Sequence, residues 1–210
     1  MSFRVAVLVS GEGTNLQALL DAVHRQHGIE IVAVGASTAG ARGLERARRA
    51  GVEARTFAVA DHGDRAARDR ALADWLDERL VDLVVLAGFM ELLGPEFIAR
   101  FRGRIINVHP ALLPSFPGLA AIEQALEHGV KVSGVTVHFV DEGIDSGPII
   151  LQESFELPYS RPIAEIEERV HGIEHRLLPR AVRLIAEGRV RIDAANPRLV
   201  RIDPPGDGAH

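Results

Sequence analysis

Residues 4–15 have the sequence RVAVLVSGEGTN, and this stretch decides the class of fold. The apolar, β-branched run 4–10 is typical of a buried strand, and Gly11 ends it. Apolar side chains then recur at the spacing of one helix face, namely Leu16, Leu19, Leu20 and Val23. A strand, a tight glycine turn and a helix in this order form the repeating unit of a parallel α/β sheet.

The same alternation continues along the first half of the chain. Further strands are predicted at residues 30–37, 52–59, 82–87 and 104–108, with helices at 14–25, 44–50, 64–79 and 95–101. After residue 110 the pattern changes to a helix at 119–128, strands at 131–140 and 148–155, a long helix at 163–187 and a hairpin of 189–193 with 199–202. We therefore predict one α/β domain over residues 1–202 and a disordered tail at 203–210. The domain is Rossmann-like, with an open, twisted, mostly parallel sheet and helices on both faces.

Composition argues against several classes of protein. The chain has 210 residues, 47% of them hydrophobic and 25% charged, which is the balance of a globular protein. A net charge of −5 offers no electrostatic surface for long nucleic acid, and no apolar run reaches the about 20 residues of a membrane span. With no cysteine, there is no disulfide, thiol nucleophile or thiolate metal site. These features fit a cytoplasmic protein with no nucleic-acid or membrane partner. We further expect small-molecule substrates and a monomer or homodimer.

Four unusual stretches lie at the ends of predicted strands. They are SGEGTN at 10–15, GFMELL at 88–93, NVHPALLPSFPG at 107–118 and DEGIDSGP at 141–148. In an open parallel sheet, ligands bind beyond the carboxyl ends of the strands, so these stretches are the candidates for a site.

The turn at 10–15 is suited to a phosphate group. Its glycines let the backbone approach a ligand, Thr14 or Asn15 can cap the next helix, and the helix N-terminus offers free N–H groups. The dinucleotide fingerprint fails because Leu16 stands in place of its third glycine, and no Gly-Lys-Ser/Thr of a P-loop follows. A monophosphate is the simplest ligand, and an ordinary capped helix is the alternative.

Asn107 and His109 come at the end of the strand 104–108 and share one side of it by alternation. An amide donor beside an imidazole suits addition to a carbonyl, where negative charge develops on oxygen. Asp145, in a glycine-rich loop, would favour the charged imidazole if it lies close to His109. Each residue alone also fits a structural role at a strand end or a turn, and His138 fits a structural or supporting role.

Two other kinds of site find no support. His171 and His175 lie four residues apart on one predicted helix, but no HExxH pattern or carboxylate shell accompanies them, so we predict no metal site. No Gly-x-Ser-x-Gly motif is present, which argues against a serine hydrolase.

Taken together, the motifs resemble the phosphoribosylglycinamide formyltransferase family, the folate-dependent transformylases of purine synthesis. The motifs that carry the resemblance are SGEGTNLQAL, LAGFM, INVHPALLPSFPG and GVTVHFVDEGIDSGPI, and it covers nearly the whole chain. It implies transfer of a formyl group from 10-formyltetrahydrofolate to the amine of 5'-phosphoribosylglycinamide in de novo purine biosynthesis, with no metal.

The resemblance also implies roles for individual residues. Asn107, His109 and Asp145 match the catalytic trio of the family. The residues matched to the phosphoribosylglycinamide site are Gly13, Thr14, Asn15 and Glu174. The loop 140–145 is matched to the pterin site, and the residues matched to folate binding are Arg65, Met90, Glu91, Leu92, Leu93, Val140 and Asp141.

Two departures from the family pattern are visible. Glu91 stands where many relatives carry a basic residue, which affects folate affinity if that contact is made by the side chain. Residues 120–123, AAIE, lack histidines that some relatives carry after the Pro-Gly, so such histidines are not essential in this chain.

Four alternatives are weighed against this interpretation. One is a non-catalytic folate or nucleotide binding module, which would leave Asn107, His109 and Asp145 without a shared task. A methionyl-tRNA formyltransferase is expected to carry a further C-terminal domain and a basic face, and a formyltetrahydrofolate hydrolase usually has an added N-terminal domain. We expect neither feature in this chain of 210 residues. A nucleotide-binding dehydrogenase is disfavoured by the broken glycine fingerprint.

Overall fold

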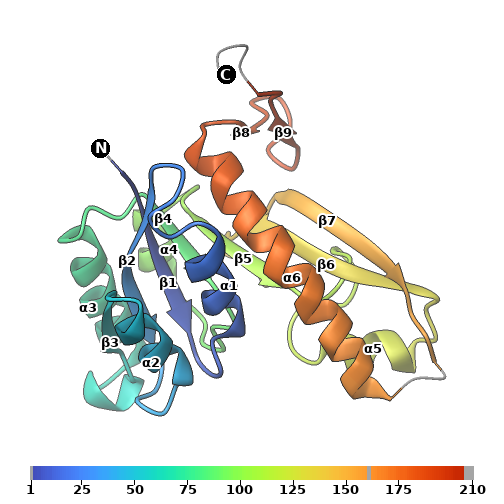
Figure 1. Ribbon diagram of the computed structural model, residues 1–210, viewed down its shortest axis with the longest axis horizontal. Helices are drawn as coiled ribbons and strands as arrows, with labels where there is room; N and C mark the ends of the chain where they lie inside the picture. The colour runs from blue at the N-terminus through green and yellow to red at the C-terminus, as the bar shows by residue number, and fades with distance from the viewer. Residues whose placement is uncertain (1, 160–161, 206–210) are drawn as a thin grey trace.

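The computed structural model describes residues 2–159 and 162–205 and forms one central sheet (Figure 1). Its seven strands lie in the order β3-β2-β1-β4-β5-β6-β7. Their bounds are β1 Phe3–Val9, β2 Ile29–Ala36, β3 Glu53–Thr56, β4 Leu83–Leu86, β5 Ile105–His109, β6 Val132–Phe139 and β7 Ile149–Glu156. The neighbours among β3, β2, β1, β4 and β5 pair in parallel. Strand β6 pairs antiparallel with both β5 and β7. The prediction of a mostly parallel α/β sheet is confirmed.

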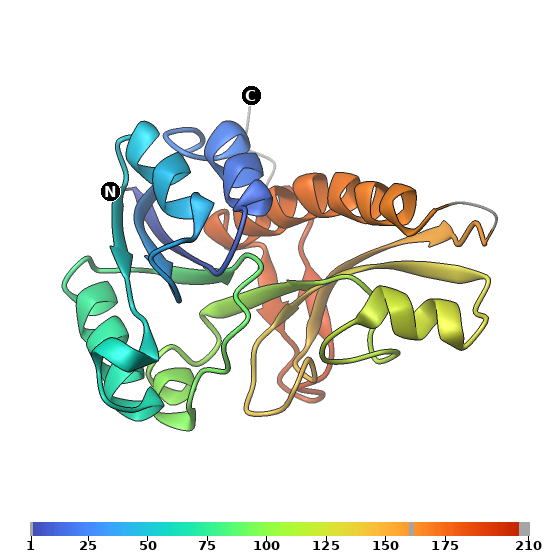
Figure 2. The same ribbon diagram turned by 90° about the horizontal axis from the view of Figure 1, so that it is seen from below.

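Helices cover both faces of this sheet (Figure 2). The helices are α1 Thr14–Ala22, α2 Arg42–Arg49, α3 Arg65–Asp77, α4 Pro95–Arg100, α5 Ala121–Glu127 and α6 Ile163–Ala186, with a short 3-10 helix at Val59–Asp61. Alternation along β1 supplies both cores: Val5, Val7 and Val9 pack with α1, α2 and α6, while Ala6 and Leu8 pack with α3 and α4. A strand covered on both faces is apolar throughout, which explains the run noted in the sequence.

The order of strands places a crevice beside β1. From β1 the chain builds outward through β2 and β3, then crosses back to add β4 and β5 on the other side. Connections that leave adjacent strands in opposite directions open a space at the carboxyl ends of those strands. The turn after β1, the loop after β4 and the end of β5 therefore meet at one edge of the sheet.

Several boundaries differ from the sequence-based expectation. The strand predicted at 52–59 pairs only over Glu53–Thr56, because β3 is an edge strand with β2 as its one neighbour in the sheet. The helix predicted at 119–128 begins at Ala121, because Ala120 has a left-handed φ of 56°. The predicted hairpin is confirmed as β8 Val190–Ile192 paired with β9 Val200–Ile202.

Of the predicted tail 203–210, residues 203–205 follow β9 without regular structure, and residues 206–210 lie outside the described residues. Within the described ranges, no helix has the length and apolarity that crossing a membrane requires.

Candidate active site

The end of β5 and the loop after β6 bring the three predicted catalytic residues together. Asn107 and His109 alternate on β5, and Asn107 lies opposite His138 of β6 in the antiparallel register. Asp145 comes from the loop that joins β6 to β7. Asn107 Nδ2 lies 3.3 Å from Asp145 Oδ1, and His109 Nδ1 lies 3.3 Å from Asp145 Oδ2. The structure thus places side chains separated by 36 to 38 positions in one cluster.

Asp145 is the centre of this cluster because both of its carboxylate oxygens accept hydrogen bonds or face a ring nitrogen. The backbone N–H of Gly118 donates to Oδ2 at 2.8 Å, and His138 Nε2 lies 3.5 Å from Oδ1. Its backbone has a left-handed φ of 47°, a conformation that aspartate tolerates better than most residues. Such strain at a functional position persists only where the surroundings determine the geometry.

The electrostatic environment of Asp145 keeps its carboxylate ionised. Burial raises the pKa of this group, but hydrogen bonding to His138 and to the Gly118 N–H and the charge of His109 outweigh that effect. The net result lowers the pKa of Asp145 from 3.8 to about 2. A permanent negative charge therefore lies beside the His109 ring at any physiological pH.

The His109 ring is buried and held at both nitrogens. Its side chain is 5% exposed, Nδ1 faces Asp145, and Nε2 lies 2.8 Å from the carbonyl oxygen of Phe116. Both neighbours are acceptors, so a ring that carries both protons satisfies both contacts. Both N–H groups are then engaged, so donation to a developing oxyanion requires Nε2–H to leave the Phe116 carbonyl.

A pocket of about 350 Å³ opens beside this cluster and contains most of the predicted folate residues. It is lined by the loop after β4, the end of β5, the start of α5 and the loop after β6. The predicted residues among its lining are Met90, Glu91, Leu92, Leu93, Val140, Asp141, Asn107, His109 and Asp145. Met90, Leu92, Leu119 and Ile144 are exposed apolar side chains, and an apolar ligand in the pocket could cover them.

Arg65 is the predicted folate residue that the structure does not bring to this pocket. It is exposed in the first turn of α3 and is absent from the pocket lining. One helical turn further on, Arg68 is fully buried behind the loop after β4, and its Nη2 lies 3.9 Å from Glu91 Oε2. The role assigned to Arg65 stays a prediction.

The glycine turn after β1 enters α1 differently from the sequence-based expectation. Neither Thr14 nor Asn15 caps the helix; the N-cap is Gly13, with a left-handed φ of 71° and no side-chain cap. A Cβ at Gly13 would lie 2.7 Å from the Cα of Gly43, so α2 packs too close for a side chain. With no side chain over the helix start, the first N–H groups of α1 are left for a ligand.

Asn15 instead connects the turn to α6. Its Nδ2 donates to Glu174 Oε2 at 3.0 Å, and both residues are buried. Asn15 Oδ1 has no hydrogen-bond partner within the described residues. Burial raises the pKa of Glu174, and the hydrogen bond from Asn15 and the charge of His171 oppose that shift. Two buried polar groups with unused capacity thus lie beside the glycine turn.

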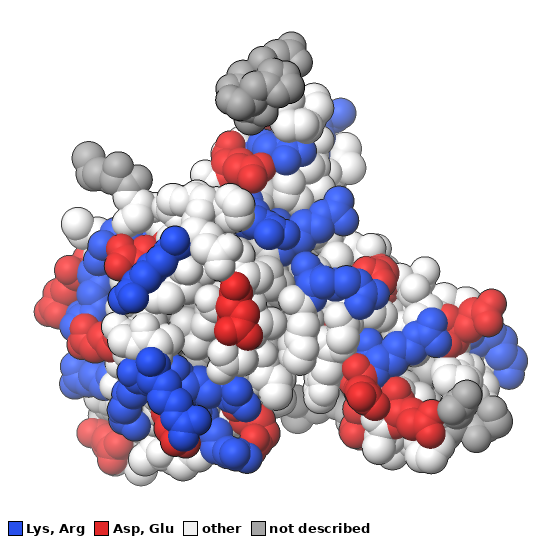
Figure 3. Space-filling view, viewed as in Figure 1, with Lys and Arg blue, Asp and Glu red and all other residues white. Residues whose placement is uncertain are grey.

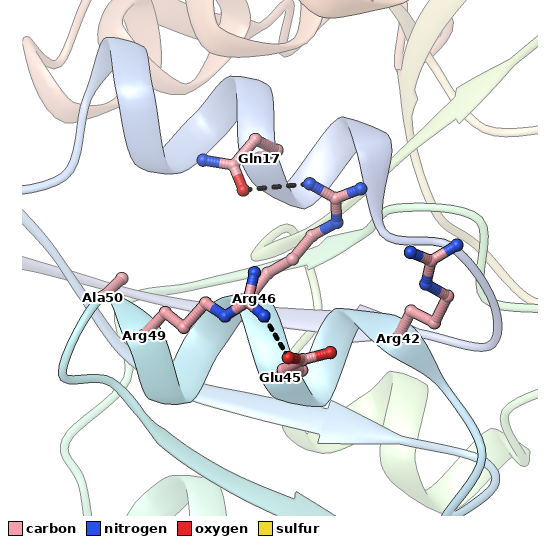
Figure 4. Close-up of a pocket in the computed structure, with 6 residues that line it drawn as sticks. All are labelled: Gln17, Arg42, Glu45, Arg46, Arg49 and Ala50. Carbon is pink, nitrogen blue, oxygen red and sulfur yellow. Dashed lines mark hydrogen bonds and ion pairs between the residues drawn. The ribbon is translucent and has the colours of Figure 1, made fainter.

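Side chains of helix α2 bond to the glycine turn, a contact that the sequence did not indicate. Arg46 Nη1 donates to Gln17 Oε1 at 3.1 Å across the groove between α1 and α2 (Figure 4). The Nε of Arg46 donates to the carbonyl of Glu12 at 2.9 Å. Arg42 forms an ion pair of 2.9 Å with the Glu12 side chain. Figure 3 shows the basic side chains gathered over α2, with acidic side chains beside them.

The arrangement of Asn107, His109 and Asp145 is of the kind that stabilises a tetrahedral oxyanion. The described residues contain no group of metal ligands beside it. Among residues 2–159 and 162–205, no three His, Cys, Asp or Glu side chains are grouped so as to hold a metal ion. An amide, an imidazole and a carboxylate in one pocket can orient a carbonyl, donate to its oxygen and move protons.

Comparison with protein families decides the class. The family model described as formyl transferase matches residues 3–182. The chain belongs to the formyl transferase family. As a member of this family it is a one-carbon transferase, which agrees with a candidate site suited to addition to a carbonyl.

Similar curated proteins point to one branch of the formyl transferases. The phosphoribosylglycinamide formyltransferase of Escherichia coli (strain K12) is 41% identical over 209 residues, which cover 98% of each chain. The trifunctional purine biosynthetic protein adenosine-3 of Bos taurus is 44% identical over 190 residues. This formyl transferase spans only about a fifth of that longer relative, since the match covers 19% of it.

Solved structures of formyl transferases have the same fold. Glycinamide ribonucleotide transformylase 1 from Symbiobacterium toebii has a TM-score of 0.92 and 48% identity, covering 97% of this chain and 95% of that one. A formyltetrahydrofolate deformylase from Pseudomonas syringae has a TM-score of 0.87 and 26% identity, covering 97% of this chain and 67% of that one.

Proposed function

We propose that this chain transfers the formyl group of 10-formyltetrahydrofolate to the amine of 5'-phosphoribosylglycinamide. The observation that carries the proposal is the Asp145-centred cluster with Asn107 and His109, which lies in a pocket at the same sheet edge as an unblocked helix N-terminus. The similarity to phosphoribosylglycinamide formyltransferases over nearly the full chain supports the same substrates.

In the proposed reaction, the substrate amine attacks the formyl carbon and the carbonyl oxygen becomes an oxyanion. Asn107 directs its amide nitrogen at Asp145 Oδ1 and, at 3.4 Å, at His138 Nε2. In the proposed reaction the N–H that faces His138 turns to the oxyanion, because a primary amide has two donors. His109 supplies the second donor, and Asp145 stabilises its positive charge. The amine loses a proton, and the leaving folate nitrogen takes one as its bond to the formyl carbon breaks. Asp145 and His109 are placed to order that transfer.

The acceptor substrate is proposed to lie along the first turn of α1. Its phosphate meets the N–H groups at Gly13, Thr14 and Asn15, where the helix dipole favours negative charge. Its ribose hydroxyls donate to the buried carboxylate of Glu174, which retains acceptor capacity beyond the bond from Asn15. These contacts fix the amine relative to the donor, and such positioning is a large part of catalysis.

The formyl donor is proposed to occupy the pocket beside the loop after β4. Its flat pterin suits a space walled by the backbone of residues 88–93 and 140–145, with apolar side chains at the mouth. The cytoplasmic location, the small-molecule partners without nucleic acid or membrane, the monomeric or dimeric state and the independence from metal stay predictions.

A second candidate is hydrolysis of the formyl donor, in which water replaces the amine. The fold similarity to a formyltetrahydrofolate deformylase favours considering it. The built phosphate turn, with Gly13, Asn15 and Glu174, has no task in that reaction because water needs no phosphate site.

One experiment separates the two reactions. Release of tetrahydrofolate by the purified chain is measured with and without 5'-phosphoribosylglycinamide, and formation of the formylated ribonucleotide is followed by mass spectrometry. We expect release only when the ribonucleotide is present, in equal amounts with the formylated product. Equal release without it would support hydrolysis and contradict the proposal.

A further inference from the structure

The loop after β4 is held in place by two buried charged residues that are not part of the pocket lining. Arg68 and Asp69 of α3 are 0% and 3% exposed, and Arg68 Nε lies 2.6 Å from Asp69 Oδ1. Arg68 Nη2 donates to the carbonyl of Leu92 at 3.2 Å, and Asp69 Oδ2 accepts from the N–H of Gly94 at 2.6 Å. Each member of the pair therefore bonds to the backbone of the loop.

The other end of the loop is fixed by a different residue. The N–H of Met90 donates to Ser10 Oγ at 2.8 Å, and the N–H of Ser10 donates to the carbonyl of Gly88 at 3.1 Å. Between these anchors the backbone of residues 88–93 forms one wall of the pocket. The wall thus has two supports, one on the turn after β1 and one on the Arg68–Asp69 pair.

Stability alone does not account for this pair. Arg68 Nη1 is buried without a hydrogen-bond partner among the described residues, and the guanidinium packs 5.7 Å from the Phe89 ring centroid. A buried ion pair with an unsatisfied N–H stabilises a fold less well than apolar side chains of similar volume. The planar guanidinium can instead bond Asp69 and Leu92 at once, which is a positioning task.

Glu91 is part of the same arrangement. It is a partly exposed carboxylate in the pocket lining, and its Oε2 lies 3.9 Å from Arg68 Nη2. The buried cation therefore offsets a negative charge at the position where the sequence departs from the family pattern. The net negative charge that faces the pocket is therefore smaller than the charge of Glu91 alone.

We propose that Arg68 and Asp69 are positioning residues for the formyl donor, acting through the backbone of Leu92 and Gly94. This inference rests on the proposed function, since it takes the pocket beside residues 88–93 as the donor side. The acceptor side, at Gly13, Asn15 and Glu174, lies on other elements and does not depend on the pair.

The test compares Arg68→Met and Arg68→Lys with Arg70→Met. Arg70 is an exposed neighbour on the same helix, with an ion pair of 3.8 Å to Glu96, so its variant controls for loss of a surface charge on α3. We expect Arg68→Met to raise KM for 10-formyltetrahydrofolate by about tenfold or more, as loss of a charge-assisted hydrogen bond predicts. KM for the ribonucleotide should stay unchanged, Arg68→Lys should recover part of the loss, and Arg70→Met should match the wild type.

Calorimetric titration with tetrahydrofolate gives a second readout that needs no turnover. We expect its dissociation constant to rise in Arg68→Met in parallel with KM. The inference is overturned if Arg68→Met has the wild-type KM for the formyl donor, or if KM rises equally for both substrates. It is also overturned if neither Arg68 variant shows a cooperative unfolding transition. If the wild-type chain itself formylates no ribonucleotide, the proposed function fails, and the inference then stands or falls on the tetrahydrofolate titration.

Discussion

At the scale of the residue, the proposed reaction depends on donors aimed at one carboxylate and one oxyanion. Asn107→Ala and His109→Ala should each lower turnover by about 100- to 1000-fold, the cost of losing one oxyanion donor. Both should keep the wild-type circular dichroism spectrum. Steady-state kinetics provide the measurement, with the exposed Asn196→Ala in the turn of the β8–β9 hairpin as the matched control. Near-wild-type turnover in either site variant would contradict the assigned roles.

The ionised state of Asp145 makes a pH-dependent contribution to stability. Its pKa is lowered to about 2 in the folded chain, so the stabilisation is present above the unfolded value of 3.8 and is lost as pH falls through about 2. At neutral pH we expect Asp145→Asn to reduce the free energy of unfolding by about 2 kcal/mol. Urea unfolding at pH 7, 4 and 3 should show this difference shrinking toward low pH. A difference that stays constant would refute the electrostatic account.

The contribution of Glu174 to stability depends on pH in the opposite direction. Burial raises the pKa of this carboxyl, so its contribution to stability is favourable below the unfolded value of 4.5 and is lost as pH rises through the folded value. Glu174→Gln should therefore raise the unfolding free energy at pH 7 and change it little at pH 4, while KM for the ribonucleotide rises. Thermal unfolding at the two pH values measures this, with the exposed Glu168→Gln of the same helix as control. A variant less stable than the wild type at pH 7 would show that the ionised group is well paired.

At the scale of the element, the close contact between α2 and the glycine turn shapes the proposed phosphate site. Gly13→Ala places a Cβ 2.7 Å from Gly43 Cα at a φ of 71°, whereas a Cβ at Gly11 meets no atom within 4 Å. We expect Gly13→Ala to destabilise the chain by about 1–3 kcal/mol and to raise KM for the ribonucleotide. Gly11→Ala should leave stability unchanged. Urea unfolding and kinetics of both variants test this, and equal stability of the two would argue against the strain.

At the scale of the whole molecule, we expect stability and catalysis to depend on different sets of apolar side chains. Leu8 is fully buried on the α3 face of the sheet, whereas Leu119 is 76% exposed at the pocket. Leu8→Ala should cost about 2–5 kcal/mol of stability yet leave turnover unchanged at temperatures where the variant is folded. Leu119→Ala should leave stability unchanged and raise KM for the folate. Thermal unfolding and steady-state kinetics of both variants test this. A change in both stability and KM in each variant would contradict the separation.

The local pattern of the chain was sufficient for the class of fold and for the candidate residues. Apolar runs of strand length, helical periodicity and glycine turns depend on near neighbours, so they identified the alternating elements and the hairpin at the C-terminal end. They also showed that Asn107 and His109 share a side, because alternation is a property of one strand. The resemblance of the motifs then suggested which of these residues work together.

Only the tertiary structure decided which distant groups meet. Asp145 reaches His109 because β5 and β6 pair antiparallel in one register, and no local rule sets that register. Gly13, rather than Thr14 or Asn15, is the N-cap of α1, and α2 packs too close to it for a side chain. Likewise, Arg68 in its helix had no sequence signal that set it apart from exposed Arg65. Burial and contact depend on how whole elements pack, and one-dimensional spacing does not contain that information.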